Sequence, residues 1–416
     1  MKYLYNIGIL VYTFAACILS PFSRKARLWT SGRKGWEKRL AENVDPGNTN
    51  LWIHCASLGE FEQGRPLIET IKKSRPGIKI ILTFFSPSGY EIRKNYSFAD
   101  YVCYLPADTP GNAARFISSV NPSAVIFVKY EFWNNYISVL DKLNIPLHLV
   151  SGIFRPGQHF FRWYGSFFRR MLLRFSHIFV QDSRSAELLR NAGIEKVTVA
   201  GDTRFDRVVE IAASAKEIPE IEKFRGNEKL VMVGSSWWQD EEIIARYIRE
   251  NSGNLKWVFA PHEIDIPNIE RLERLLGYGV VRFSNYDWSS NSARIMIIDN
   301  IGMLSSAYRY AHIAVVGGGF GKGIHNILEA ACWGIPVVFG PNHKKFREAV
   351  EMIAEGGAFA YNNYEDFRRI IDACLNDENY YRLSAGIALD YVRKNTGATN
   401  VIVSELNIKD MNRPFS

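Results

Sequence analysis

The sequence is poor in cysteine and lacks the paired spacing of a disulfide or zinc framework. Its five cysteines are scattered over 416 residues, which argues against both frameworks and fits a reducing compartment. Internal repeats and low-complexity segments are also absent. The content of 47% hydrophobic and 23% charged residues is that of a folded globular protein. A chain of this length is too long for one ordinary core, so we expect two domains.

An excess of negative charge is also absent. The formal net charge is +8, which favours an anionic partner such as nucleic acid, a phospholipid surface or a phosphorylated substrate. A soluble basic protein without such a partner is the alternative. No recognised nucleic-acid-binding module occurs and the charge is spread along the chain, so we expect no nucleic-acid partner.

A long hydrophobic run occupies the N-terminus. Residues 3–19 are apolar except for Asn6 and Thr13, and seven basic residues follow between 24 and 39. About 17 apolar residues is the short end of what spans a bilayer, and the basic flank predicts that the following domain stays in the cytoplasm. We therefore predict a membrane anchor at 1–22. A cleaved signal peptide is the alternative, because residues 14–17 faintly resemble a lipoprotein cleavage site.

Short apolar runs alternate with helical patterns along the rest of the chain. This alternation predicts an α/β fold with parallel, doubly wound sheets covered on both faces. A polar stretch at 206–228 interrupts the alternation, which then starts again. This arrangement predicts two Rossmann-like domains facing each other across a cleft. The predicted divisions are domains at 23–205 and 229–395, a linker at 206–228 and a C-terminal tail at 396–416. The predicted strands are 51–56, 78–84, 101–106, 124–129, 145–150, 177–181, 196–200, 229–234, 256–260, 279–283, 294–299, 312–316 and 335–339.

Two acidic clusters follow strands of the first domain, where open α/β sheets place their ligand sites. Glu60 is expected near the start of a helix, where its carboxylate could take a proton from an attacking hydroxyl. The alternative is a capping box, since Ser57 and Glu60 have the S-x-x-E spacing. Glu131 stands beside Trp133 after the strand 124–129. It could hold a substrate or stabilise charge, or it could be a structural carboxylate paired with a nearby base.

A glycine-rich segment, 316–329, follows a strand of the second domain. Glycines such as Gly318 and Gly319 let the backbone approach a phosphate, and the helix expected to contain Glu329 offers unpaired N–H groups at its start. No Gly-Lys-Ser/Thr follows, and the spacing departs from the dinucleotide fingerprint. We favour a nucleotide-sugar site over a purely structural turn. Weaker candidates for phosphate contact follow two other strands: Ser235, Ser236, Pro261 and His262. A lone histidine such as His262 is more often structural.

Aromatic residues alternate with arginines at 160–177. We predict a basic amphipathic helix that suits a phospholipid surface or a phosphorylated lipid. An ordinary helix with solvated arginines is the alternative.

Taken in order, these clusters resemble the Kdo (3-deoxy-D-manno-octulosonic acid) transferase family over almost the whole chain. The resemblance implies a GT-B fold and an inverting, metal-independent glycosyltransferase. It implies transfer of Kdo from CMP-Kdo to the 6′-hydroxyl of the tetraacyl lipid A precursor (lipid IVA), in lipopolysaccharide biosynthesis at the cytoplasmic face of the bacterial inner membrane. The motifs that carry it are HCASLGE (54–60), EFW (131–133), GDTRFD (201–206), GSSWWQDEE (234–242), GIHNILE (323–329) and GIPVVFGP (334–341).

The resemblance also implies residue roles. Glu60 would be the general base, and Glu131 and Arg204 would stabilise the transition state. No cofactor is implied, in agreement with the lack of an Asp-x-Asp motif in the sequence. The residues implied to hold CMP-Kdo are Pro261, His262, Ile301, Gly302, Met303, Asn326, Ile327, Leu328 and Glu329.

Several positions depart from the family pattern. Arg204 replaces a lysine, which keeps the charge and changes the donor geometry. Met303 stands where glutamate is usual, His262 where arginine is usual, and Lys129 where another acid is common. Two other functions stay open: a GT-B transferase that uses a different nucleotide sugar, such as UDP-GlcNAc, and a non-catalytic membrane-attached relative.

Overall fold

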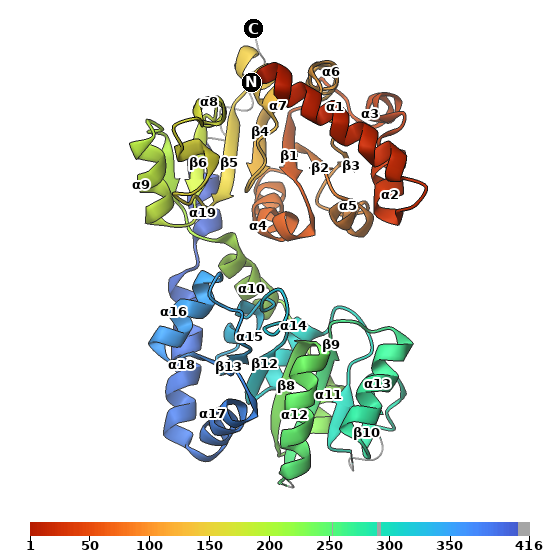
Figure 1. Cartoon of the computed structure of the whole chain (residues 1–416), viewed down its shortest axis with the longest axis vertical. Coiled ribbons are helices and arrows are strands. Elements are labelled where there is room, and N and C mark those ends of the chain that lie inside the picture. Colours follow the sequence, from red (N-terminus) through yellow and green to blue (C-terminus); the bar gives the residue numbers. More distant parts are fainter. Residues whose placement is uncertain (252, 289–292, 407–416) are drawn as a thin grey trace. The chain divides into compact units, whose positions relative to one another are not determined.

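The computed structural model of the protein describes residues 1–251, 253–288 and 293–406 and divides the chain into two compact units. Unit 1 contains residues 1–207 and the chain end from 396, and unit 2 contains residues 208–395. Each unit is built on its own sheet (Figure 1). The last ten residues of the predicted tail, 407–416, lie outside the described residues.

Unit 1 holds a seven-stranded sheet in the order β3-β2-β1-β4-β5-β6-β7, in which every pair is parallel. Its first strand in sequence, β1, is central, with β2 on one side and β4 on the other. The strands are β1 (Asn50–Cys55), β2 (Lys79–Phe84), β3 (Tyr101–Tyr104), β4 (Pro122–Val128), β5 (Leu147–Gly152), β6 (His177–Val180) and β7 (Val197–Val199).

Helices cover both faces of this sheet because its central strands are apolar on both sides. Every residue of β1 is buried. Leu51 and Ile53 pack in one core cluster and Trp52 packs in the other. The helices are α1 (Lys2–Leu19), α2 (Arg24–Arg33), α3 (Trp36–Asn43), α4 (Leu58–Ser74), α5 (Pro87–Arg93), α6 (Pro110–Val120), α7 (Asn134–Lys142), η1 (His159–Phe161), α8 (Ser166–Leu172), α9 (Ser183–Asn191), α10 (Thr203–Ala213), which continues into unit 2, and α19 (Ala398–Glu405).

Helix α1 is long and apolar enough to cross a membrane, and one of its faces contacts unit 1. The Tyr5 hydroxyl donates to the buried Asp108 carboxylate at 2.6 Å, and Asn135 Nδ2 donates to Asn6 Oδ1 at 2.9 Å. Tyr12 packs edge-on against Trp29, with ring centroids 5.5 Å apart. Most of its large apolar side chains are exposed, among them Tyr3, Leu4, Ile7, Leu10, Val11, Phe14, Ile18 and Leu19.

Unit 2 repeats the architecture with a parallel sheet in the order β10-β11-β9-β8-β12-β13-β14. The strands are β8 (Lys229–Ser236), β9 (Leu255–Pro261), β10 (Val280–Arg282), β11 (Ile295–Ile297), β12 (Ile313–Val316), β13 (Val337–Phe339) and β14 (Ala358–Ala360). The helices are α11 (Pro219–Arg225), α12 (Trp238–Glu250), α13 (Ile266–Leu276), η2 (Phe283–Asn285), α14 (Leu304–Ala307), η3 (Tyr308–Tyr310), α15 (Leu328–Ala331), α16 (Arg347–Glu355), α17 (Tyr364–Asn376) and α18 (Glu378–Lys394).

The predicted fold class, two parallel sheets of the doubly wound type, is confirmed. All thirteen predicted strands are present, and the structure adds β14, which is only three residues long. The predicted single helix at 160–177 is wrong: the segment contains the short η1 and the seven-residue α8. The chain turns at Gly165, where a Cβ atom would lie 1.8 Å from the carbonyl oxygen of His159, and this turn prevents a continuous helix.

Helix α19 belongs to unit 1 although it follows the whole of unit 2 in the chain. Ile402 and Leu406 are part of the core cluster that contains β1, and α19 packs against α4. The Asp206 carboxylate fixes the start of this segment by accepting the Gly397 N–H at 2.6 Å and the Thr399 N–H at 2.7 Å.

Candidate functional site

Most of the predicted residues lie at the carboxyl ends of the central strands in the two sheets, whereas Arg204 follows the edge strand β7 and Ile301–Met303 follow β11. In unit 1 the strand order reverses between β1 and β4, and in unit 2 it reverses between β8 and β12. Open α/β sheets bind ligands at such switch points, since the following loops diverge there. Three non-glycine residues near these strand ends have left-handed backbones, an arrangement that costs energy and clusters at functional sites: Lys129, Ser151 and Ser235.

Glu60 lies in the first turn of α4, directly after β1, and is half-buried. Ser57 occupies the N-cap position, yet its side chain caps no backbone N–H. Its hydroxyl donates to the Glu60 carboxylate instead. The S-x-x-E spacing therefore forms a serine–carboxylate contact rather than a capping box. The carboxylate remains accessible at the end of the central strand.

Glu131 is held by a buried network at the ends of β1 and β4. The Trp52 indole donates to the Thr83 hydroxyl at 2.8 Å, so this hydroxyl can donate to His54 Nδ1, also at 2.8 Å. That assignment leaves the His54 Nε2–H to donate to Glu131 Oε2 at 3.0 Å. The Trp133 indole N–H lies 2.7 Å from the same oxygen and 3.1 Å from His54 Nε2, so we assign it to the carboxylate. Glu131 thus receives two directed donors.

Arg204 is the second residue of α10 and pairs with Asp202. Its Nε and Nη2 atoms lie 2.8 and 2.7 Å from Asp202 Oδ2. The preceding Thr203 hydroxyl donates to the Gln63 carbonyl at 2.6 Å, which joins the start of α10 to the helix that carries Glu60. The guanidinium is therefore fixed, and Asp202 offsets part of its charge.

In unit 2, Asp240 connects the loops that follow β8 and β12. Its carboxylate accepts the Gly318 N–H at 3.0 Å, the Trp237 N–H at 3.2 Å and the Tyr361 hydroxyl at 3.0 Å. Burial raises the pKa of Asp240, against the lowering effect of these three donors. Ser236, a weaker phosphate candidate, is buried, and its hydroxyl donates to Glu241 at 2.8 Å.

Three aromatic rings gather at the ends of β8, β9 and β12. His262 stacks on Trp237 and on His325, with centroids 4.6 and 4.5 Å apart. The Trp237 indole donates to His325 Nε2 at 3.0 Å, which leaves the hydrogen of a neutral imidazole on Nδ1. Burial, aided by His262, lowers the pKa of His325 to about 4. His325 is therefore neutral at pH 7.

Glu329 organises a second group of predicted donor residues. Its carboxylate accepts Asn326 Nδ2 at 3.0 Å and the Ser305 hydroxyl at 2.7 Å. Ser305 lies in α14, which follows the predicted segment Ile301–Met303, and the Ile301 side chain is 87% exposed. Ile327 and Leu328 are buried, so only their backbones are available to a ligand. Pro261 ends β9, beside the stacked His262.

The helix expected around Glu329 is much shorter than the sequence suggested. Helix α15 has only four residues, Leu328–Ala331, so a helix N-terminus contributes little to anion binding there. Neighbouring protein atoms also occupy the space left by two glycines. A Cβ atom on Gly318 would lie 2.7 Å from the Gly323 carbonyl oxygen, and one on Gly319 would lie 2.5 Å from the Gly340 Cα. These two glycines permit close packing of the protein's own loops.

Within residues 1–251, 253–288 and 293–406, no three His, Cys, Asp or Glu side chains are grouped so that they could hold a metal ion.

Comparison with known proteins decides the family. A family model described as 3-deoxy-D-manno-octulosonic-acid transferase (kdotransferase) matches residues 34–207. The 3-deoxy-D-manno-octulosonic acid transferase of Aquifex aeolicus is 31% identical over 315 residues, covering 74% of this chain and 80% of that protein. The chain belongs to the Kdo transferase family. A Kdo transferase of Haemophilus influenzae is 26% identical over 386 residues, covering 87% of this chain and 89% of its own length.

A solved structure supports the fold of this Kdo transferase family member. A glycosyltransferase of Rickettsia africae aligns with a TM-score of 0.56 at 14% identity, covering 89% of this chain and all of that one. At this identity the likeness concerns the fold, which is of the GT-B class.

The structure also places in these networks residues that were not predicted to have a role, among them His54, Trp237, Asp240 and Ser305. His54 precedes Glu60 in the HCASLGE motif, and Trp237 and Asp240 lie in GSSWWQDEE, so their motifs signalled them. The sequence around Ser305 has no such signal, because its contact with Glu329 spans 24 residues.

Proposed function

We propose that this Kdo transferase moves Kdo from CMP-Kdo to the 6′-hydroxyl of lipid IVA in a single, inverting displacement. The acceptor oxygen forms a bond to the anomeric carbon of Kdo while its proton passes to Glu60. The bond between that carbon and the CMP phosphate oxygen breaks, and CMP leaves with the electron pair. No metal or other cofactor takes part.

The observation that carries this proposal is the difference in surroundings between two carboxylates of unit 1, those of Glu60 and Glu131. Glu60 is half-buried and accepts a hydrogen bond from the Ser57 hydroxyl, so it can accept a proton from an incoming alcohol. Glu131 is 8% exposed and bound by two N–H donors. A carboxylate held in this way suits a fixed negative charge that stabilises developing positive charge on the sugar. Arg204 would assist at the departing phosphate.

The donor side rests on unit 2. Asn326, Glu329 and the segment Ile301–Met303, whose first two residues are exposed, present polar groups and backbone at one place, as a nucleoside requires. The stacked His262 offers an aromatic surface beside them, from the end of the neighbouring strand β9. We propose that these residues hold CMP-Kdo, with Ser235 as a weaker contact.

We also propose that α1 attaches the protein to the cytoplasmic face of the bacterial inner membrane. Its exposed apolar side chains, such as Phe14 at 68% exposure, would enter the lipid. Because Tyr5 and Asn6 tie the helix to unit 1, we expect attachment through the outward face rather than a crossing. Alkaline carbonate should then release the protein from membranes, whereas retention in the pellet would favour a spanning helix.

Product analysis tests the chemistry. Purified protein, CMP-Kdo and lipid IVA should yield CMP and an acceptor heavier by a Kdo unit in a mass spectrum. Turnover with UDP-GlcNAc in place of CMP-Kdo would favour the other nucleotide sugar, and no nucleotide release with either donor would favour a non-catalytic relative.

The base is tested by Glu60→Gln, which keeps the side-chain size and removes the proton acceptor. We expect kcat to fall about a hundredfold or more while the affinity for CMP-Kdo is unchanged. Glu62→Gln is the matched control, since Glu62 lies in the same helix and pairs with Arg93 at 2.8 Å. Near-wild-type turnover of the Glu60 variant would remove this residue from its role.

A further inference from the structure

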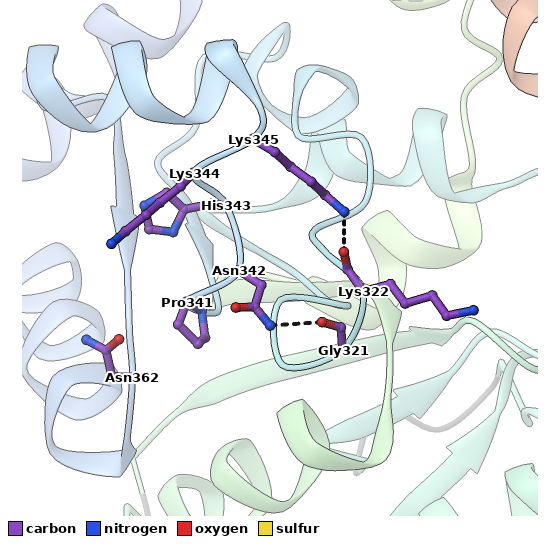
Figure 2. Close-up of a pocket in the computed structure, with 8 residues that line it drawn as sticks. All are labelled: Gly321, Lys322, Pro341, Asn342, His343, Lys344, Lys345 and Asn362. Atoms are coloured by element: carbon purple, nitrogen blue, oxygen red, sulfur yellow. Dashed lines mark hydrogen bonds between the residues drawn. The ribbon is translucent and has the colours of Figure 1, made fainter. Parts of the chain in front are cut away.

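A cationic pocket in unit 2 lies beside the proposed donor residues and includes none of them. Its volume is about 540 Å³, within the range of roughly 300–1,000 Å³ typical of small-molecule sites. The lining residues include Lys322, Asn342, His343, Lys344, Lys345 and Asn362 (Figure 2). They come from the loops after β12, β13 and β14, so the pocket lies at the carboxyl ends of three neighbouring parallel strands.

The pocket is built on a fixed loop frame. The Asn342 backbone N–H donates to the Gly319 carbonyl at 2.8 Å, and its side-chain amide donates to the Gly321 carbonyl at 2.8 Å. The Lys345 ammonium donates to the Lys322 carbonyl, as Figure 2 shows. These bonds join the loop after β13 to the glycine-rich loop after β12. Lys345 is therefore used to hold the frame.

Two other lysines leave their charge available to a ligand. The ammonium groups of Lys322 and Lys344 are exposed and have no hydrogen-bond or ion-pair partner within the part of the chain that the structure describes. No Asp or Glu is among the residues that line the pocket. In Figure 2 the Lys344 side chain extends away from Lys345, and the Lys322 side chain points out on the other side of the loops. Such a surface attracts an anion.

The proposed donor carries two negatively charged groups, and Arg204, the cation assigned to its phosphate, belongs to unit 1. CMP-Kdo bears a phosphate diester and the carboxylate of the sugar acid. The residues assigned to it in unit 2 include no lysine or arginine, and the adjacent His325 is neutral at pH 7 because its pKa is lowered to about 4. The glycine-rich segment adds full positive charge through Lys322, and the loop bonded to it adds Lys344 and Lys345.

We infer that the pocket containing Lys322 and Lys344 binds the carboxylate of the sugar acid on the donor. This assignment rests on the proposed function and adds to it a specificity site for acidic sugars. A neutral sugar nucleotide would gain nothing from the positive charge of this pocket.

The test separates the sugar from the nucleotide. KM for CMP-Kdo is measured at saturating lipid IVA, and Ki is measured for CMP, which lacks the carboxylate, as a competitive inhibitor. We expect KM to rise about threefold in Lys344→Gln and about tenfold in Lys322→Gln/Lys344→Gln, since each pair is partly exposed, while Ki for CMP stays unchanged. Lys344→Arg should restore the wild-type KM. Lys223→Gln, at an exposed lysine of α11 in the same unit, is the matched control.

Three outcomes would overturn the inference. An unchanged KM in the double variant, with thermal stability preserved, would show that the pocket takes no part in donor binding. Equal increases in KM and in Ki for CMP would assign the pocket to the phosphate instead of the carboxylate. An increase in the Lys223 control would show a general effect of net charge. Absence of turnover in the wild-type protein would reject the proposed function itself, and that result is distinct from the other three.

Discussion

Replacing His54 by leucine would test whether the buried network positions Glu131. His54 is fully buried, and its Nε2–H donates to Glu131 Oε2 at 3.0 Å. Leucine has a similar volume, so the change removes the donor without opening a large cavity. A hydrogen bond to a charged group contributes about 1.5–3 kcal/mol. The Thr83 hydroxyl, which loses Nδ1 as its acceptor, can turn to the Ile53 carbonyl at 3.4 Å. We therefore expect the free energy of unfolding to fall by about 2–3 kcal/mol.

The catalytic consequence follows from the loss of one of two donors. Glu131 would keep only the Trp133 indole, and its carboxylate could rotate about that contact. Misplacement of a reacting group by about 1 Å can cost about a hundredfold in rate, so we expect kcat to fall ten- to a hundredfold with little change in KM. Urea unfolding measures the first effect, and steady-state release of CMP measures the second.

His148→Leu is the matched control for this prediction. His148 is also a buried histidine of the same sheet, at 8% exposure, and its Nδ1 atom has no hydrogen-bond partner in the described part of the chain. Burial lowers its pKa to about 4. Leucine should be tolerated there, because it removes a buried polar atom that is unsatisfied. Equal losses of stability in the two variants, together with an unchanged kcat in His54→Leu, would refute the positioning role.

Two further predictions concern unit boundaries and pH. Asp206→Ala removes the carboxylate that accepts N–H groups of Gly397 and Thr399, so we expect about 1–2 kcal/mol less stability and faster proteolytic loss of the chain end, measured by mass spectrometry. The pKa of His325 is lowered to about 4, so the neutral form contributes stability that is complete above about pH 6.5 and is lost as the pH falls toward 4. When the pH falls from 7 to 5, the His325→Gln variant should therefore lose less stability than the wild type. The difference should be about 1 kcal/mol, after allowance for the partial exposure of His325. Equal losses in the two proteins would contradict the lowered pKa of His325.

The sequence predicts the sheets well because buried parallel strands are apolar on both sides. Strand β4, at Pro122–Val128, is almost wholly buried, and its apolar run predicts the strand 124–129. Strand β14 was not predicted, since only three residues, Ala358–Ala360, pair with β13 and two of them are partly exposed. Such a short edge strand is defined by its neighbour rather than by its own pattern.

The sites were harder to predict than the strands, because their contacts join residues distant in sequence. The spacing of Ser57 and Glu60 fits a capping box, and only the three-dimensional arrangement shows that the serine donates to the carboxylate. The link between His54 and Glu131 spans 77 residues, and local sequence contains no trace of it. The lysine pocket likewise combines loops after three strands, and its lysines lie outside the recognised motifs.

The position of α19 has a consequence for how the chain matures on the ribosome. Unit 1 lacks Ile402 and Leu406, two residues of its core, until the whole of unit 2 has been translated, although most of its sequence emerges first. Unit 2, a continuous segment, has no such delay. We expect nascent chains stalled before residue 396 to contain a folded unit 2 and a loosely packed unit 1, so that the unit containing the proposed base, Glu60, becomes complete last.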